Sequence, residues 1–471
     1  MNRTVSVWEQ ELLGKILGQK TREIIDALER AGATCYLVGG AVRDLLLGIP
    51  ATDIDIEVHR VSLERLQELL APFGRVDLVG KSFGVLRIAA APDVDWSVPR
   101  RDGPGRKPAV VLDSDMGIVE ALRRRDLTMN AMAICTATGE LVDPFGGQAD
   151  MRAKRLRAPD LERFVEDPLR FFRVMQFVGR FDMYPDSALQ ACCASMDLQA
   201  IARERIEEEF YKLFLKSRLP SRGIRWLKDV GRLGELFPEL GELCGLEQPV
   251  KWHPEGDVFE HTMQALDASV SESIPDDYRL VFCYAALCHD LGKVETTERM
   301  PDGRIASHGH ETAGVARAAS LLRRITRNVQ LISLVKLLVR HHMAPGQFVK
   351  TNAGRAAYKR LAMKVMPLSL KLLACCASAD MRGRNGSGHE PLPGPVPVIE
   401  EFMARAEAYG VLEGPEEPVV QGKDFLTLCE PGPVIGDLVR AAYRLQIDEG
   451  ICDRDVLVQR VMHGYVREKK V

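Results

Sequence analysis

Short apolar runs alternate with segments of helical apolar spacing along the first 150 residues of the chain. The runs have the length of β-strands, and the segments between them have the periodicity of amphipathic helices. The turn-forming sequence VDPFGG ends this alternation at residue 147. The pattern therefore predicts an α+β domain at residues 1–150, with strands at 36–38, 54–58 and 84–90 and helices at 41–47 and 62–70.

The spacing of apolar positions becomes helical from about residue 160, as in EDPLRFFRVMQFVGRF and ERIEEEFYKLFLK. A further helical section begins near KWHPEGDVFEH and continues to about residue 385. The Gly- and Pro-rich stretch GRNGSGHEPLPGPVP, residues 384–398, predicts a linker before a helical tail. We therefore expect four parts, at residues 1–150, 151–245, 246–385 and 386–471.

The composition is that of a globular protein with several domains. The chain has 471 residues, of which 46% are hydrophobic and 27% are charged. No apolar run approaches the roughly 20 residues that span a bilayer, and the first residues lack the apolar core of a signal peptide. The 11 cysteines include no Cys-x-x-Cys pair, which is typical of reduced thiols. We expect a cytoplasmic protein without membrane contact.

The distribution of charge allows a nucleic-acid partner but does not require one. The net charge of −3 argues against a uniformly basic nucleic-acid binder. Residues 151–232 nevertheless contain more Lys and Arg than Asp and Glu. Such an excess suits phosphate contacts, although a solvated helical surface explains it equally on charge alone.

A strand, a tight turn and a helix are predicted in the sequence YLVGGAVRDLLLG. Gly39 and Gly40 form the turn and permit a ligand to approach the backbone closely. Free N–H groups at the start of the following helix attract phosphate, and Arg43 in its first turn is a candidate for a bidentate phosphate contact. A purely structural turn is at least as consistent with the two glycines alone.

Asp53 and Asp55 lie two residues apart on a predicted strand, so their side chains point to the same face. Two adjacent carboxylates repel each other unless a cation lies between them. Their oxygen atoms suit Mg²⁺, which retains water and substrate phosphates in its coordination shell. Asp95, in VDWSVPR, is a further candidate ligand from a neighbouring strand. An edge strand with two solvent-facing aspartates is the alternative interpretation.

The sequence EDPLRFFRV combines a helix start with three charged side chains on one face. Asp167 followed by Pro168 is typical of an N-cap, which alone explains the aspartate. Arg170 follows three residues later and lies on the same face. A carboxylate beside a guanidinium can match the hydrogen-bonding edge of a nucleobase, and Arg173 continues this face towards phosphate.

The sequence RRRDLTMNA places Arg124, Arg125, Asp126 and Asn130 at a predicted helix start. Cations at the N-terminus of a helix oppose the helix dipole. That opposition favours a functional interpretation of the arginines over a basic first turn.

His261, His289, Asp290 and Asp380 occur in this order in the third part of the chain. Imidazole and carboxylate ligands suit a transition metal, and open coordination positions suit metal-assisted hydrolysis of a phosphoester. A single histidine is more often structural, but this ordered set is not easily explained in that way. The sequence leaves the participation of four further histidines open: His308, His310, His341 and His342.

Five motifs occur in order along the chain: LVGGAVRDLLLG, DIDIEV, RRRDLTMNAMAI, DPFGG and EDPLRFFRV. Together they resemble those of the class II tRNA nucleotidyltransferases, the CCA-adding enzymes, and of the related bacterial poly(A) polymerases. The resemblance implies an α+β fold with a polymerase-beta-like nucleotidyltransferase head, in which helices accompany a mixed sheet. An all-helical neck and body, an HD domain and a tail would follow.

The resemblance also implies a reaction and the residues that carry it. The reaction is Mg²⁺-dependent addition of CMP and AMP to the tRNA 3′ end from CTP and ATP, without a nucleic-acid template. Asp53 and Asp55 would be catalytic metal ligands, with Asp95 as a further candidate. The loop PRRDGPGRKP, residues 99–108, resembles the flexible loop of this family. The nucleotide would be bound by Gly39, Gly40, Arg43, Arg125, Asp126, Asp167, Arg170 and Arg173, of which Asp167 and Arg170 would select the base.

The motifs KWHPEGDVFEHT, CHDLGK and HGHETAG resemble the HD phosphohydrolase domain that some CCA-adding enzymes carry. The resemblance implies phosphatase and 2′,3′-cyclic phosphodiesterase activities with a divalent transition metal. Its ligands would be His261, His289, Asp290 and Asp380, with His310 and His342 as further candidates.

Three alternatives remain open. The nearest is a partial enzyme that adds only CC or only A, or a poly(A) polymerase. A metal-dependent phosphohydrolase whose head only binds RNA is a second, although simple binding does not need a repelling pair of carboxylates. A non-enzymatic RNA-binding scaffold is a third. The sequence is compatible with either a monomer or a homodimer.

Overall fold

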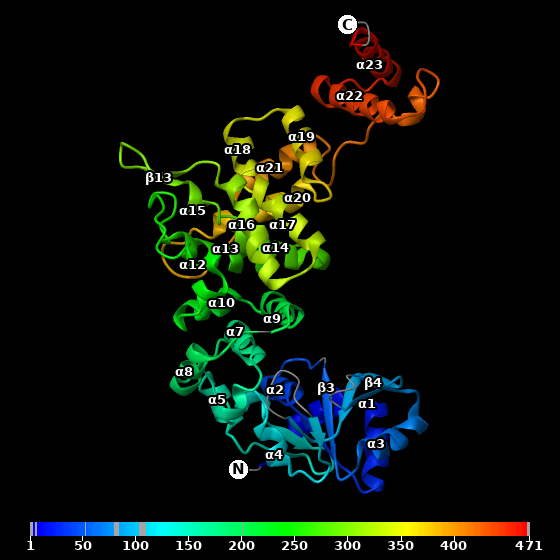
Figure 1. Ribbon diagram of the computed structural model, residues 1–471, viewed down its shortest axis with the longest axis vertical. Coiled ribbons are helices and arrows are strands. Elements are labelled where there is room, and N and C mark those ends of the chain that lie inside the picture. The colour runs from blue at the N-terminus through cyan, green and yellow to red at the C-terminus, as the bar shows by residue number, and fades with distance from the viewer. Residues whose placement is uncertain are drawn as a thin grey trace. The chain divides into compact units, whose positions relative to one another are not determined.

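The computed structural model describes residues 3–4, 7–51, 53–79, 84–102, 110–199 and 201–468. The chain divides into two compact units (Figure 1). The first comprises Met1–Glu209 and Asp229–Gly231, and the second comprises Phe210–Lys228 and Arg232–Val471. The first boundary between them falls inside helix α9 (Arg203–Lys216).

An eight-stranded sheet forms the centre of the first unit, within the residues that the structure describes. Strands β3 and β6 are parallel, and the other neighbouring pairs are antiparallel. The sheet is therefore mixed, as the resemblance implied, and the α+β fold class is confirmed. In spatial order the strands are β1 (Arg3–Thr4), β10 (Glu140–Val142), β9 (Ala133–Cys135), β2 (Thr34–Val38), β3 (Ile54–His59), β6 (Ala91–Ser97), β5 (Val85–Ile88) and β4 (Val76–Val79).

Alternation of side chains along β3 separates the core of this unit from its polar face. Ile54, Ile56 and Val58 are buried apolar residues, so residues 55 and 57 point to the opposite face. Three helices accompany the sheet: α1 (Val7–Arg30) and α2 (Gly40–Leu47) contact its strands, and α3 (Leu63–Leu70) contacts α1.

The predicted strands and helices of this unit are present with bounds that differ by a few residues. The predicted strands correspond to β2, β3 and β5, and the predicted helices correspond to α2 and α3. Strands β9 and β10 were not predicted. Each has three residues, which is too short to display a period of two.

The rest of the first unit is mainly helical. A parallel pair of two-residue strands, β11 (Arg155–Leu156) with β12 (Tyr184–Pro185), was not predicted from the helical spacing. In the predicted flexible loop, residues 103–108 lie outside the described residues, and the chain on either side forms β7 (Arg100–Asp102) and β8 (Val110–Leu112). The remaining elements are η1 (Ala71–Phe73), α4 (Ile118–Arg123), η2 (Thr128–Asn130), α5 (Gly147–Arg152), α6 (Leu161–Phe164), α7 (Leu169–Phe181) and α8 (Ser187–Ser195).

Helices form most of the second unit, as predicted. Helix α13 (Val258–Ser271) is central because it contacts both α14 (Asp276–Cys288) and α20 (Leu370–Arg382). A hairpin of β13 (Thr297–Arg299) and β14 (Ile305–Ser307) was not predicted. The other helices before the tail are α10 (Ser221–Asp229), α11 (Leu233–Leu236), α12 (Pro238–Gly241), α15 (Lys293–Thr296), α16 (His310–Ile325), α17 (Val329–His341), α18 (Ala344–Lys350), α19 (Arg355–Val365) and α21 (Pro397–Ala408).

The predicted linker is irregular, but hydrogen bonds attach it to α13. The Gln264 side chain donates to the carbonyl of Asn385 at 3.1 Å and accepts from its N–H at 3.0 Å. Helix α21 follows and contacts α18 and α20, and its Phe402 stacks on Tyr358 of α19 with ring centroids 5.0 Å apart. The chain immediately after the linker therefore packs on the second unit.

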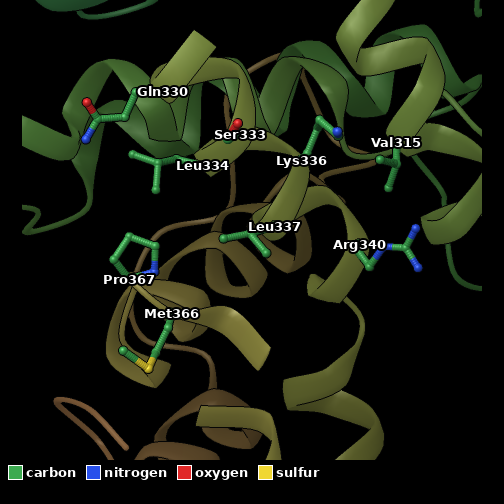
Figure 2. Close-up of a pocket in the computed structure, with 9 residues that line it drawn as sticks. All are labelled: Val315, Gln330, Ser333, Leu334, Lys336, Leu337, Arg340, Met366 and Pro367. Atoms are coloured by element: carbon green, nitrogen blue, oxygen red, sulfur yellow. The ribbon is translucent and has the colours of Figure 1, made fainter. Parts of the chain in front are cut away.

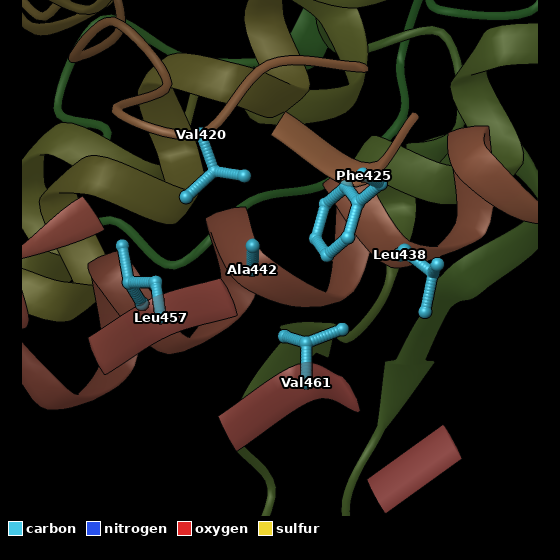
Figure 3. Packing of buried hydrophobic residues seen from close by; sticks show 6 residues of the cluster. All are labelled: Val420, Phe425, Leu438, Ala442, Leu457 and Val461. Atoms are coloured by element: carbon cyan, nitrogen blue, oxygen red, sulfur yellow. The ribbon is translucent and has the colours of Figure 1, made fainter. Parts of the chain in front are cut away.

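The C-terminal helices enclose a hydrophobic cluster (Figure 3). Helix α22 (Pro433–Glu449) packs against α23 (Arg454–Glu468) and against η3 (Gly422–Phe425). The buried members of the cluster are Val420, Phe425, Leu438, Ala442, Leu457 and Val461.

A mainly apolar cavity of the second unit lies along α17 (Figure 2). Its lining includes Leu334, Leu337 and Arg340 from this helix, with Met366 and Pro367 from the loop after α19. None of the predicted metal ligands lines it. Within the described residues no single helix is long and apolar enough to cross a membrane, and one bent pair, α19 with α20, passes that test only when combined.

Candidate active sites

Asp55 and Asp95 occupy opposed positions on the parallel neighbours β3 and β6. Asp53 directly precedes β3 and is exposed. Asp53 lies outside the strand, but its charge acts on Asp55, so the two carboxylates are electrostatic neighbours. The strand register then adds Asp95, so the fold brings together the three carboxylates that were predicted as Mg²⁺ ligands.

The electrostatics of this carboxylate cluster fit a divalent cation. Burial raises the pKa of Asp55, and the charges of Asp95 and Asp53 raise it further, whereas Arg125 opposes the change. Arg87 binds Asp95 through Nε and Nη2, the latter at 3.1 Å. Three carboxylates therefore meet two guanidinium groups, and a hard divalent cation would relieve the remaining repulsion.

Gly39 begins the turn before α2, as predicted. The structure gives a reason for glycine at this position that the sequence did not indicate. Its φ of 74° lies in the region that favours glycine, and a Cβ at this position would collide with the guanidinium of Arg125. The same Cβ would lie 3.6 Å from Asp55 Oδ2. The absence of a side chain at residue 39 thus lets Arg125 lie against the backbone, beside the carboxylate cluster and the start of α2.

Arg43 is held inside the first unit by other side chains. It is 5% exposed, and it donates from Nε to Asp44 at 2.8 Å and from Nη1 to Asn130 at 2.6 Å. Its guanidinium also lies 4.7 Å from the ring centroid of Phe181. These contacts hold the Arg43 side chain in place, and its predicted phosphate contact stays a prediction.

The predicted helix start at RRRDLTMNA is wrong. Helix α4 ends at Arg123, and Arg124 is its C-cap, where a positive charge is favourable to the helix dipole. The dipole argument for a functional arginine therefore fails, although the segment lies beside the carboxylate cluster. Arg124 Nη2 is 3.3 Å from Glu57 Oε2, and Glu57 is buried on the same strand as Asp55.

Asp126 connects this segment to helix α7. It accepts hydrogen bonds from Asn130 at 3.0 Å and from Arg173 Nε at 2.6 Å. Burial opposes ionisation of Asp126, but Arg173 and Asn130 hold its pKa below the ordinary value. The predicted nucleotide-binding residues Asp126 and Arg173 are therefore brought together as an ion pair.

Asp167 and Arg170 lie at the start of α7, as predicted, and each binds protein groups. Asp167 accepts a hydrogen bond from the N–H of Leu169, the first residue of α7, at 3.1 Å, although Pro168 occupies the N-cap position that was predicted for Asp167. Arg205 of α9 donates two hydrogen bonds to Asp167, at 3.2 and 2.8 Å. Arg170 donates to the backbone carbonyls of Arg163 and Arg124, at 2.7 and 2.5 Å.

In the second unit, four residues from three places in the sequence converge. The Nε2 atoms of His261 and His289 are 3.1 Å apart. Asp380 Oδ1 lies 3.1 Å from His261 Nε2, and Asp290 Oδ2 lies 3.2 Å from His289 Nε2. The four predicted ligands are thus adjacent, on α13, at the end of α14 and on α20.

Two of the histidines that the sequence left open join this group. His310 Nε2 lies 3.2 Å from His342 Nε2 and 3.3 Å from Asp290 Oδ1. Asp290 Oδ2 therefore faces His261 and His289, whereas Oδ1 faces His310, which in turn contacts His342. His308 is exposed, and within the described residues neither it nor His341 belongs to a metal-competent group. We call the set His261, His289, Asp290, His310, His342 and Asp380 the histidine–aspartate cluster.

The ring orientations in this cluster suit metal binding. The Nδ1 atoms of His289, His310 and His342 lie 2.7 to 2.8 Å from backbone carbonyl oxygens, to which they can only donate. Their Nε2 atoms therefore carry lone pairs towards the centre. Burial and the charges of neighbouring histidines lower the pKa of His342 to about 3, which keeps its imidazole neutral. The donor set fits divalent transition-metal ions.

Three outer partners of the cluster were not predicted. Glu255 Oε1 lies 2.8 Å from His261 Nδ1, Lys293 Nζ lies 2.6 Å from Asp290, and Arg384 donates to Asp380 at 2.9 Å. Such partners fix the orientation of ligands. Lys293 and Arg384 lie within four residues of a predicted ligand, so helical spacing was a signal that could have identified them.

The first unit combines two features. A mixed sheet carries a cluster of carboxylates on adjacent strands, and Arg125 lies beside the turn at the start of α2. Residues 35–157 match the family model of the poly A polymerase head domain. This match includes the sheet residues that carry Asp55 and Asp95, so the first unit contains a nucleotidyltransferase head.

A multifunctional CCA protein from Ralstonia nicotianae is 33% identical to this chain over 400 residues, which are 80% of this chain and 88% of that protein. The chain therefore belongs to the family of CCA-adding enzymes, which are tRNA nucleotidyltransferases. Membership implies a divalent metal ion at the head.

Solved structures of CCA-adding enzymes share the fold along nearly the whole chain. The Bacillus stearothermophilus enzyme in complex with CTP has a TM-score of 0.66 at 20% identity and covers 97% of this chain and 100% of its own. The Thermotoga maritima enzyme complexed with tRNA has a TM-score of 0.59 at 20% identity and covers 99% of both chains.

Proposed function

We propose that this enzyme adds CMP and AMP, from CTP and ATP, to the 3′ end of tRNA to build or repair the CCA end. The observation that carries the proposal is the register that sets Asp55 opposite Asp95, with Arg125 against Gly39 beside them. The printed names of the relatives support the substrates, since one is a multifunctional CCA protein and others are CCA-adding enzymes with tRNA, ATP or CTP.

The residues of the head bind and orient the reactants. Asp53 and Asp55 would hold Mg²⁺, with Asp95 as a third ligand, and the bound ion would supply charge neutralisation at the triphosphate and acidify the attacking hydroxyl. Arg125 and the N–H groups at the start of α2 hold the triphosphate. The 3′-oxygen of tRNA forms a bond to the α-phosphorus as the bond to the β-phosphate breaks, and pyrophosphate and a proton leave.

Base selection falls to the start of α7. Asp167 offers acceptor atoms and Arg170 offers donors, and the pattern of donors and acceptors distinguishes bases. Arg205 fixes Asp167 through two hydrogen bonds, at 3.2 and 2.8 Å. Asp126 and Arg173 form the ion pair that continues this surface towards the ribose and phosphate.

The test of this activity supplies tRNA that ends before CCA with CTP alone, ATP alone or both. We expect extension by two residues with CTP, no extension with ATP alone, and complete CCA with both. Asp53→Ala should abolish all incorporation. Addition of only CC or only A would identify a partial enzyme instead. A long tail of A would identify a poly(A) polymerase. Mg²⁺-insensitive tRNA binding without turnover would indicate a scaffold.

We also infer a second, hydrolytic activity at the histidine–aspartate cluster. His261 and His289 face Oδ2 of Asp290, and His310 faces Oδ1, so these residues would hold divalent ions that activate water for hydrolysis of a phosphoester. Nucleoside 2′,3′-cyclic phosphates and phosphomonoesters are the substrates to test. Hydrolysis that disappears in His289→Ala but persists in Asp53→Ala would assign the activity to this cluster. Activity that disappears in Asp53→Ala would reject it.

We propose that the enzyme acts in the cytoplasm, without membrane contact. The enzyme would act as a monomer or a homodimer, and sedimentation at several concentrations separates these two states.

A further inference from the structure

The turn between Gln248 and Glu255 is attached to the histidine–aspartate cluster at both ends. Gln248 Oε1 accepts a hydrogen bond of 2.6 Å from Lys293, whose Nζ lies 2.6 Å from Asp290 Oδ2. Glu255 Oε1 lies 2.8 Å from His261 Nδ1. Both ends of the turn therefore contact members of the cluster or residues that bind its members. These contacts position the residues between Gln248 and Glu255.

The middle of this turn is apolar and exposed. Val250 is 77% exposed and Trp252 is 61% exposed, whereas the other two tryptophans whose side chains the structure describes are at most 2% exposed. Leaving an indole in water forgoes the favourable free energy of burial. The N–H groups of Trp252 and His253 both donate to the carbonyl of Pro249 at 2.9 Å, which fixes the backbone that carries the indole.

Two neighbours of Trp252 give this position its chemistry. Lys251 Nζ lies over the Trp252 ring, 5.0 Å from its centroid, so a positive charge covers one face of the indole and a base would stack on the other. On the other side in sequence, the His253 ring makes an edge contact with His261 at a centroid distance of 4.8 Å. A cation, an aromatic surface and a histidine that contacts the cluster are thus consecutive in this turn, as Lys251, Trp252 and His253.

We propose that Trp252 is the stacking surface for the nucleobase of a nucleoside phosphate that is hydrolysed at the histidine–aspartate cluster, a role that rests on the hydrolytic activity proposed above. Every base has an aromatic face that an indole can stack on, so recognition would tolerate all four bases. Lys251 would attract the phosphate charge. For a nucleoside 2′,3′-cyclic phosphate, a water oxygen bonds to phosphorus, one ester P–O bond breaks, and the released ribose oxygen takes a proton.

The first measurement compares steady-state hydrolysis of two substrates by the full-length enzyme. With a nucleoside 2′,3′-cyclic phosphate, Trp252→Ala should raise KM about tenfold and leave kcat unchanged, and Trp252→Phe should retain most of the affinity. With methyl riboside 2′,3′-cyclic phosphate, which has no base, the variants should match the wild type. Val329→Ala removes an apolar side chain that is 75% exposed on the same unit and serves as a control.

The second measurement does not depend on turnover. The difference in tryptophan fluorescence between the wild type and Trp252→Phe isolates the Trp252 indole, and a nucleoside 2′-monophosphate should quench it. Quenching without hydrolysis would support base stacking and reject the hydrolytic activity. Hydrolysis with an unchanged KM in Trp252→Ala, or an absence of quenching, would overturn the stacking role. A wild-type dimer that Trp252→Ala dissociates would also overturn it, by assigning the indole to contact with a second copy of the chain.

Discussion

Asp55 of β3 lies directly opposite Asp95 of β6, in a parallel pairing within a sheet whose other described neighbours are antiparallel. Strands β4 and β5 lie between β3 and β6 in the sequence, so the contact between Asp55 and Asp95 depends on how the sheet is assembled. Burial and the neighbouring carboxylates raise the pKa of Asp55. A divalent cation held by this pair would therefore stabilise the folded arrangement as well as support the reaction.

Removing the carboxylate charge of Asp95 tests its place as a metal ligand. Asp95→Asn should lower CMP incorporation more than about 100-fold at low Mg²⁺, because charge stabilisation by a metal contributes several kcal/mol. Excess Mg²⁺ should restore part of the loss. Asp77→Asn, which changes an exposed residue of β4, is the matched control. A wild-type dependence on Mg²⁺ in Asp95→Asn would remove this residue from the site.

Arg205 offers a test of base selection that leaves Asp167 in place. Arg205→Ala deletes two hydrogen bonds, of 3.2 and 2.8 Å, and frees the carboxylate to move. We expect the preference for CTP and ATP over UTP and GTP to fall about tenfold or more, measured as ratios of kcat/KM. Arg203→Ala alters the same helix two residues earlier and should keep the preference. Equal loss for all nucleotides would point to a structural role instead.

The parts of the site that could be predicted are those set by local periodicity. The spacing of Asp53 and Asp55 fixes a shared face on any strand, and helical spacing placed Asp167 and Arg170 at one helix start. The sequence order of His261, the His289–Asp290 pair and Asp380 indicated a metal site. The folded chain brings these four residues together.

The remainder depends on tertiary packing that no local pattern encodes. Arg43 is buried because Phe181 and Asn130 meet it from distant segments. Arg205 is 38 residues from Asp167, so no spacing rule connects them. The error at RRRDLTMNA has a local cause, since the arginines close α4 instead of opening a new helix.

The two oxygen atoms of Asp290 predict two metal ions in the histidine–aspartate cluster. After dialysis against Ni²⁺, the wild type should hold two ions per chain there, and His342→Ala should hold one, as determined by elemental analysis. His341→Ala is the matched control, because His341 precedes His342 and lies outside the metal-competent groups of the described residues. CCA addition should be unchanged in both variants. One ion in the wild type and in His342→Ala alike would reject a second metal ion in the cluster.

The burial of Asp267 leads us to expect that the free energy of unfolding depends on pH, independently of any metal. This carboxyl on α13 is 4% exposed and accepts hydrogen bonds from the N–H and hydroxyl of Ser221, at 2.9 and 2.5 Å. Burial raises its pKa from 3.8 to about 7, although Ser221 and Arg225 oppose the change. The folded unit therefore prefers the protonated carboxyl, and the unfolded chain binds fewer protons between these two values.

The sign follows from this difference in bound protons: stability of the second unit should fall as pH rises from about 4 to 7 and then level off. The full effect corresponds to about 4 kcal/mol if no other group compensates. Asp267→Asn cannot ionise, so its advantage over the wild type in thermal unfolding should grow across this pH range. Asp276→Asn, which alters a side chain that is 93% exposed, should follow the wild type. A constant difference between Asp267→Asn and the wild type from pH 4 to 7 would show that Asp267 is ionised in the folded protein, because its pKa would then match that of the unfolded chain.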